Sequence, residues 1–190
     1  YPHLPSGYYT LDPSGGSDYD KFVAYCDRKT NSTCIYPDTA KFDNGTYYLG
    51  DSEEPIDFST MKNGSMISYR AVNSVQFTLL RLIYGKASQN LTYHCRNSVA
   101  VLNGQGRADH ALTLVGSNEA RMGLKGIKVD ARYTVVGDDG CQARDDTWRQ
   151  TTVVYDTKKT ERLPLVDFAV SDIGRSDQKF GVDVGPVCFS

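Results

Sequence analysis

The sequence predicts an α+β fold with a mainly antiparallel sheet and a few helices. Helix-type patterns lie early in the chain and strand-type patterns late, which is the order expected of an α+β protein. Five cysteines and four Asn-X-Ser/Thr sequons, at Asn31, Asn44, Asn63 and Asn90, indicate a secretory environment in which disulfides persist. A chain of 190 residues is most simply one domain and is long enough to bury its own core.

The N-terminal third contains the weakest patterns. Residues 1–17 are expected to form a loop, because Pro2, Pro5 and the run from Asp12 to Ser17 interrupt regular structure. A short helix is predicted next, with Asp18 and Asp20 in its first turn. Its buried side would contain Phe22, Val23, Tyr25 and Cys26. Residues 31–63 are polar, and we expect a long surface excursion with short strands at most.

The strongest helix is predicted over about 73–89. Its apolar residues recur at i, i+4, i+7 and i+8, which is one helix face: Val75, Leu79, Leu82 and Ile83. Gly85 weakens its end. Alternation then predicts a half-buried strand through Ile127, Val129, Ala131, Tyr133 and Val135. Further strands are expected at 91–95, 99–102, 111–115, 151–155 and 165–170.

Composition excludes two classes of partner. The 21 Lys and Arg residues nearly balance the 23 Asp and Glu residues, so there is no basic footprint for nucleic acid. No apolar run approaches the ~20 residues of a membrane-spanning helix.

Because the chain begins at Tyr1 without an initiator Met or a signal sequence, we expect a mature or excised fragment.

The odd number of cysteines leaves at least one outside any intrachain bridge. Five cysteines allow 5 × 3 = 15 patterns of two bridges, and their spacing alone does not choose among them. No Cys-X-X-Cys pair is present, which argues against a zinc ribbon or a thioredoxin-type site.

Several long segments resemble the C-propeptide of fibrillar procollagens. The segments are Ala87-Ser-Gln-Asn-Leu-Thr-Tyr-His-Cys-Arg-Asn-Ser98, Asp138-Asp-Gly-Cys141, Arg162-Leu-Pro-Leu165, Asp172-Ile-Gly174 and Phe180-Gly-Val-Asp-Val-Gly-Pro-Val-Cys-Phe189. They occur in the family's order across most of the chain, whereas residues 36–69 match poorly. The resemblance implies a fibrinogen-like α+β body stapled by disulfides. Residues 1–20 would form a calcium-loop or base region, and residues 21–190 a globular body.

The same resemblance implies a non-enzymatic domain for trimerisation and chain selection. Such a domain nucleates the collagen triple helix in the endoplasmic reticulum lumen. An upstream protease then removes it before fibrils form in the extracellular matrix. The expected partners are two further copies or related procollagen chains, the processing protease and matrix proteins.

The resemblance also implies a pairing of the cysteines. Cys34 matches the partner of Cys188, and Cys95 matches the partner of Cys141. Cys26 matches a cysteine whose partner lies upstream, so here it is unpaired or bonded to an external group, with a buried free thiol as the alternative. Ser17 stands where many members carry an interchain cysteine, so we expect packing and metal alone to hold the trimer.

The loop from Asp12 to Asp20 is the expected Ca²⁺ site. By itself, such a Ser/Gly loop between Asp residues is more often a simple turn. The resemblance implies that Ca²⁺ is held by Asp12, Ser14, the Gly15 carbonyl, the Ser17 carbonyl and Asp20. Ser14 replaces the usual Asn and is a shorter ligand, for which the nearby Asp18 could compensate.

The resemblance also bears on the sequons and on a group of aromatic residues. Asn90 matches its glycan position, whereas Asn31, Asn44 and Asn63 lie where it offers no guidance. The aromatic residues of its chain-selection region could form an intersubunit surface or pack in the core: Tyr47, Tyr48, Phe58 and Tyr69.

Two competing functions remain open from the residues. One is a fibrinogen-like recognition module of the lectin type. The other is a secreted hydrolase using His94 and Cys95, or the carboxylate pairs Asp138-Asp139 or Asp145-Asp146. Neighbours on a strand point to opposite faces, which argues against a His94–Cys95 pair. Adjacent Asp residues are more often turn residues, although Asp138-Asp139 could form a second calcium loop.

Overall fold

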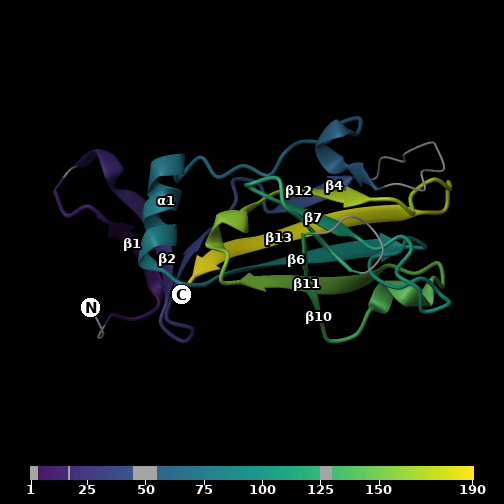
Figure 1. Ribbon diagram of the computed structural model, residues 1–190. Helices are drawn as coiled ribbons and strands as arrows, with labels where there is room; N and C mark the ends of the chain where they lie inside the picture. The colour runs from purple at the N-terminus through teal and green to yellow at the C-terminus, as the bar shows by residue number, and fades with distance from the viewer. Residues whose placement is uncertain (1–3, 17, 45–54, 125–129) are drawn as a thin grey trace.

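The computed structural model describes residues 4–16, 18–44, 55–124 and 130–190, and it places two mostly antiparallel sheets and one α-helix in them (Figure 1). The mainly antiparallel α+β character predicted from the sequence is thereby confirmed. The larger sheet runs, in spatial order, through β1 (Gly7–Leu11), β2 (Phe22–Asp27), β3 (Ser32–Ile35), β13 (Lys179–Phe189), β6 (Ala87–Arg96), β11 (Arg149–Thr157) and β10 (Thr134–Val136). An additional strand, β4 (Lys41–Asn44), pairs with β13.

The smaller sheet covers one face of the larger one. Its order is β5 (Ile56–Asp57), β12 (Leu165–Val170), β7 (Thr113–Gly116), β8 (Arg121–Gly123) and β9 (Ala131–Arg132), and only β8 and β9 are parallel. Aromatic rings join the two sheets. Phe168 of β12 lies edge-on to Phe180 of β13 with ring centroids 6.5 Å apart, and Phe180 stacks on Tyr93 of β6 at 5.7 Å. In the described part of the chain, the opposite face of the larger sheet presents exposed side chains such as Asn90 of β6 and Gln150 of β11.

The helix α1 (Ser74–Ile83) packs against the β1–β3 end of the larger sheet (Figure 1). A capping box starts it, because Asn73 Oδ1 accepts from the Gln76 N–H while Gln76 Oε1 accepts from the Asn73 N–H. The helix is shorter than predicted. It ends at Tyr84, whose backbone is extended, because Ala87 already pairs with Thr157 and Phe189 in the sheet.

The sequence-based assignment of the first 30 residues is wrong in two places. Residues 7–11 form β1 and not a loop, and residues 22–27 form β2 after a 3-10 turn, η1 (Asp18–Asp20), and not a helix. All five residues of β1 pair with β2, so the proposed boundary after Asp20 falls inside a hairpin. Cross-strand pairing overrides weak local propensity here.

Residues 31–63 are also less superficial than predicted. All four residues of β3 are buried, because β3 lies between β2 and β13. The predicted strands at 91–95, 111–115, 151–155 and 165–170 overlap β6, β7, β11 and β12. Residues 99–102 form a loop and not a strand. Ile127 and Val129 lie outside the described residues.

The remaining helical elements are 3-10 turns: η2 (Phe58–Thr60), η3 (Gly140–Ala143) and η4 (Thr160–Arg162). In the described ranges, no helix has the length and hydropathy required to cross a membrane.

Candidate assembly surface and metal loop

The apolar stripe that predicted α1 faces outward. This α1 stripe consists of Val75, Leu79, Leu82 and Ile83; Val75, Leu82 and Ile83 are 62%, 77% and 58% exposed, and Leu79 is half-buried. The side that packs on the body is instead formed by Gln76, Phe77 and Leu80. The sequence therefore located the helix and its apolar stripe, but the fold buries the opposite face.

No charge interrupts the α1 stripe. The one charged residue of the helix, Arg81, turns toward the body, where its Nη2 donates to the Leu163 carbonyl at 2.7 Å and to Ser117 Oγ at 2.9 Å. A helix normally buries its apolar side and exposes its polar side. An apolar face left in solvent is typical of a contact with another molecule.

A second apolar surface lies on the same end of the molecule. Tyr8, Tyr25 and Tyr36 form a tyrosine cluster, with ring centroids 5.3 Å apart for Tyr8 and Tyr25 and 6.3 Å apart for the other two pairs. Tyr8 is 65% exposed and Tyr36 is 44% exposed. The cluster projects from the face of β1–β3 opposite α1, because Tyr8 and Tyr25 are cross-strand partners whereas Phe22 and Ala24 are buried. Sequence analysis missed this cluster because its members meet only through strand pairing.

The acidic loop, residues 12–20, closes on itself through Asp12. Asp12 Oδ1 accepts from the Gly15 N–H at 2.8 Å, and Asp12 Oδ2 lies 4.0 Å from Lys21 Nζ. Gly15 has φ of +69°, a conformation that favours glycine. Ser14 Oγ lies 3.5 Å from Asp12 Oδ1, so the two side chains expected to bind Ca²⁺ at this end of the loop lie together.

Asp20 holds the other end of the acidic loop. Its Oδ1 is buried and has no hydrogen-bond partner among the described residues. A buried carboxylate oxygen is normally satisfied by a donor or by a cation. Ser17 and the side chain of Asp18 lie outside the described residues. Within the described ranges there is no cluster of three or more His, Cys, Asp or Glu side chains suited to a metal, so a cation here would also need carbonyl ligands.

Gln76 connects the acidic loop to α1. Its Nε2 donates to the Asp20 carbonyl at 3.1 Å and to the Lys21 carbonyl at 3.2 Å. The same side chain completes the helix capping box through Oε1. The position of the α1 N-terminus is therefore tied to the conformation of the loop. Nothing in the local sequence signals this connection, because the partners are more than 50 residues apart.

The cysteines are joined as the resemblance implies. Cys34 is bonded to Cys188 between the neighbouring strands β3 and β13, and Cys95 of β6 is bonded to Cys141 of η3. Cys26 is a half-buried free thiol.

The residues of the competing hydrolase hypothesis have structural partners. Cys95 is in a disulfide and has no thiolate to offer, and His94 lies 3.1 Å from Asp183. The two carboxylates of Asp145 and Asp146 belong to different arginines. The Arg149 guanidinium, with help from Thr147, lowers the pKa of Asp145 below its usual value. The Arg96 guanidinium likewise lowers the pKa of Asp146.

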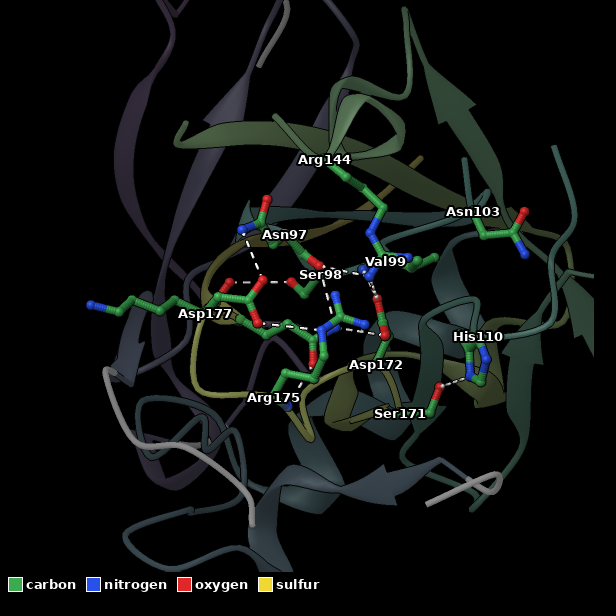
Figure 2. Close-up of polar contacts among 12 residues, drawn as sticks. Asn97, Ser98, Val99, Asn103, His110, Arg144, Ser171, Asp172, Arg175 and Asp177 are labelled. Atoms are coloured by element: carbon green, nitrogen blue, oxygen red, sulfur yellow. Dashed lines mark hydrogen bonds and ion pairs between the residues drawn. The ribbon is translucent and has the colours of Figure 1, made fainter. Parts of the chain in front are cut away.

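Asp139 is a loop anchor and not a solvated turn residue. Its Oδ2 accepts from the Leu102 N–H at 2.7 Å and its Oδ1 accepts from Thr151 Oγ1 at 2.6 Å. Figure 2 shows a similar role for Asp172, whose carboxylate lies between Arg144 Nη2 and the Val99 N–H, at 3.1 and 3.0 Å. Each of these contacts joins a segment that carries the family resemblance, 138–141 or 172–174, to residues outside those segments.

The aromatic residues of the expected chain-selection region divide into two groups. Phe58 and Tyr69 are 2% and 8% exposed, so their assignment to an intersubunit surface is wrong and core packing, the other alternative, is confirmed. Tyr47 and Tyr48 lie outside the described residues. Among the sequons, Asn31, Asn63 and Asn90 are exposed, whereas the side chain of Asn44 lies outside the described part of the chain.

Comparison with known proteins gives one consistent result. A model of the fibrillar collagen C-terminal domain matches residues 1–189. The chain is 39% identical to the collagen alpha-1(I) chain of Gallus gallus, over 97% of this chain and 13% of that protein. It is 38% identical to the collagen alpha-1(II) chain of Xenopus tropicalis, over 100% of this chain and 13% of that protein. For the collagen alpha-2(I) chain of Oncorhynchus mykiss the identity is 37%, over 100% of this chain and 14% of that protein, so the chain spans a small part of these relatives.

Proposed function

The chain belongs to the fibrillar collagen C-terminal domain family, and from this premise we propose that it is a calcium-stabilised assembly domain that joins three collagen chains. The family is structural and non-enzymatic. The observation that carries the proposal is the α1 stripe, a charge-free apolar helix face exposed on an otherwise well-packed body. The fibrinogen-like character of that body remains a prediction.

A domain of this kind answers a physical difficulty of the collagen triple helix. That helix has Gly at every third position and no hydrophobic core. Bringing three chains into register costs association free energy of at least ~4 kcal/mol. A globular interface at one end offsets this cost once for the whole length. Proteolytic removal before fibril formation is part of the same proposal.

A ring of three identical chains requires two different surfaces on each chain. Such contacts are heterologous, because a patch on one copy meets another patch on the next. The α1 stripe and the tyrosine cluster are two different apolar surfaces at one end of the body. These two surfaces could form the contacts of such a ring without a covalent link between chains. This agrees with Ser17 standing at the interchain cysteine position.

The acidic loop is suited to Ca²⁺. The carboxylates of Asp12 and Asp20, the Ser14 hydroxyl and loop carbonyls at Gly15 and Ser17 would hold it, and the orphaned Asp20 Oδ1 supports this assignment. Ca²⁺ supplies positive charge that neutralises the loop carboxylates. Through the contacts of Gln76 with the Asp20 and Lys21 carbonyls, an ordered loop fixes the start of α1 and so the α1 stripe.

Secretion and residence in the extracellular matrix complete the proposal. The exposed sequons at Asn31, Asn63 and Asn90 are then candidate glycosylation sites, with Asn44 as a fourth.

Light scattering tests assembly and its dependence on calcium together. In millimolar Ca²⁺, the range in which extracellular modules with Kd of about 10⁻⁴–10⁻³ M are loaded, we expect the mass of three chains of 21.1 kDa. A chelator is expected to release single chains, because bound ligand stabilises only the state that holds it. Asp20→Asn is expected to raise the calcium concentration needed for half-assembly roughly tenfold, a loss of ~1.4 kcal/mol.

Asp109→Asn is the matched control, because Asp109 is an exposed carboxylate that pairs with Arg107. It should leave the calcium response unchanged. Single chains in both conditions would contradict assembly by this domain. Three chains in both conditions, for the unaltered protein and for Asp20→Asn, would contradict the calcium assignment while leaving assembly intact.

A further inference from the structure

The solvent face of the larger sheet contains a hollow that the assembly proposal does not use. It has a volume of about 570 Å³ and is lined by Lys41, His94, Trp148, Gln150, Gly181 and Asp183, among others. The strand register places His94 beside Gln150 and Gly181, and Asp183 beside Lys41. Four neighbouring strands therefore present these residues on one face. Ligand pockets typically have volumes of ~300–1,000 Å³.

Most polar side chains of this Trp148 hollow have hydrogen-bonding atoms without a partner among the described residues. The indole of Trp148 is 55% exposed. Asp183 Oδ2 lies 3.1 Å from His94 Nε2, and among the described residues Asp183 Oδ1 and His94 Nδ1 have no hydrogen-bond partner. The same holds for the Gln150 amide and the Lys41 ammonium. The hollow thus combines one aromatic surface with several hydrogen-bonding groups of both kinds.

This combination matches the chemistry of a sugar. A pyranose ring has an apolar C–H face, which packs on an aromatic ring, and a rim of hydroxyl groups that both donate and accept hydrogen bonds. Trp148 offers the aromatic surface, Asp183 is an acceptor, and Lys41 and Gln150 are donors. We propose that the Trp148 hollow binds a pyranose saccharide.

The sugar has two possible sources. Asn90, the sequon on β6, lies on the same sheet face as Thr92 and His94, because alternate strand residues share a face. Four residues of strand separate Asn90 from His94 by about 13 Å. A glycan attached to Asn90 therefore begins close enough to extend over the hollow. The alternative source is a glycan carried by another molecule.

The hollow has a built-in reporter, since Trp148 is the only tryptophan of the chain. Its fluorescence is measured, with acrylamide as quencher, on the full protein secreted from animal cells and again after amidase removal of N-glycans. If the Asn90 glycan fills the hollow, removal shifts the emission to longer wavelength and increases quenching. Asn90→Gln should reproduce both changes. Asn63→Gln, which removes an exposed sequon in a turn away from β6, should reproduce neither.

If glycan removal changes nothing, the deglycosylated protein is titrated with oligomannose glycans and with the N-acetylglucosamine disaccharide. A saturable loss of quenching assigns the hollow to a glycan from another molecule. Asp183→Asn should then weaken binding by about tenfold, the effect of losing a charge-assisted hydrogen bond. Met66→Ala, a change at another exposed apolar residue, should not weaken it. An unchanged Trp148 emission in both arms overturns the proposal. Because Trp148 fluorescence does not depend on chain assembly, this experiment tests the saccharide proposal separately from the assembly proposal.

Discussion

The double variant Val75→Asp, Leu82→Lys is expected to convert the calcium-loaded assembly of three chains into single folded chains. Both substitutions put a charge on the α1 stripe, where the two residues are 62% and 77% exposed in the isolated chain. Burying an unpaired charge in an interface costs ~2–5 kcal/mol, and the apolar contact of each side chain is lost as well. Repeated in every contact of a ring, this penalty exceeds what a modest interface can absorb.

The two charges are chosen so that the fold itself does not suffer. Position 75 is in the first turn of α1, where a carboxylate interacts favourably with the helix dipole, and position 82 is in the last turn, where an ammonium does. The free energy of unfolding of the single chain, measured by urea denaturation in chelator, should therefore change by no more than about ±0.5 kcal/mol, as for ordinary surface substitutions.

Val136→Asp is the matched control for the α1 stripe. Val136 is 53% exposed on β10, far from α1 along the sheet order. The control protein should retain the mass of three chains in Ca²⁺. If the double variant also retains it, the α1 stripe is not the contact, and the tyrosine cluster becomes the surface to alter.

Removing the Cys34–Cys188 bridge is expected to cause a large loss of stability. The bridge joins residues separated by 154 positions, and the chain-entropy estimate for so long a loop is ~5 kcal/mol. For Cys95–Cys141, separated by 46 positions, the corresponding estimate is ~4 kcal/mol, to which lost packing at two buried sites is added. Urea unfolding of the paired Cys→Ala variants, in chelator and at fixed protein concentration, measures both free energies.

Cys26→Ala controls for the loss of a sulfur atom. Cys26 is a free, half-buried thiol, so this variant should lose no cross-link and less than ~1 kcal/mol. A Cys34→Ala, Cys188→Ala protein as stable as the Cys26→Ala protein would show that the bridge does not restrict the unfolded chain. A large change in the slope of the urea transition would instead show that the compactness of the unfolded state had changed.

Local sequence patterns were sufficient to place several of the elements. The segment 165–170 is a short, mostly apolar run that follows Pro164, and β12 occupies these positions. The residues of α1 repeat with the period of a helix, and the Asn73–Gln76 capping box starts it without help from the rest of the chain. Cys34 and Cys188 lie at opposite ends of the sequence, yet the family resemblance was enough to name them as partners.

Strand pairing and the burial of each helix face depend on tertiary contacts. Residues 22–27 are a strand because β1 and β3 pair with both their edges, and β6 begins at Ala87 because β11 and β13 are there to receive it. Trp148, His94 and Asp183 line one hollow only because the larger sheet brings distant segments together. The apolar character of the α1 residues is a local property of the amino-acid sequence and needs no fold to establish it. Only the fold could decide that Phe77 and Leu80 pack on the body and that the α1 stripe faces outward, because burial depends on the distant segments that cover a residue.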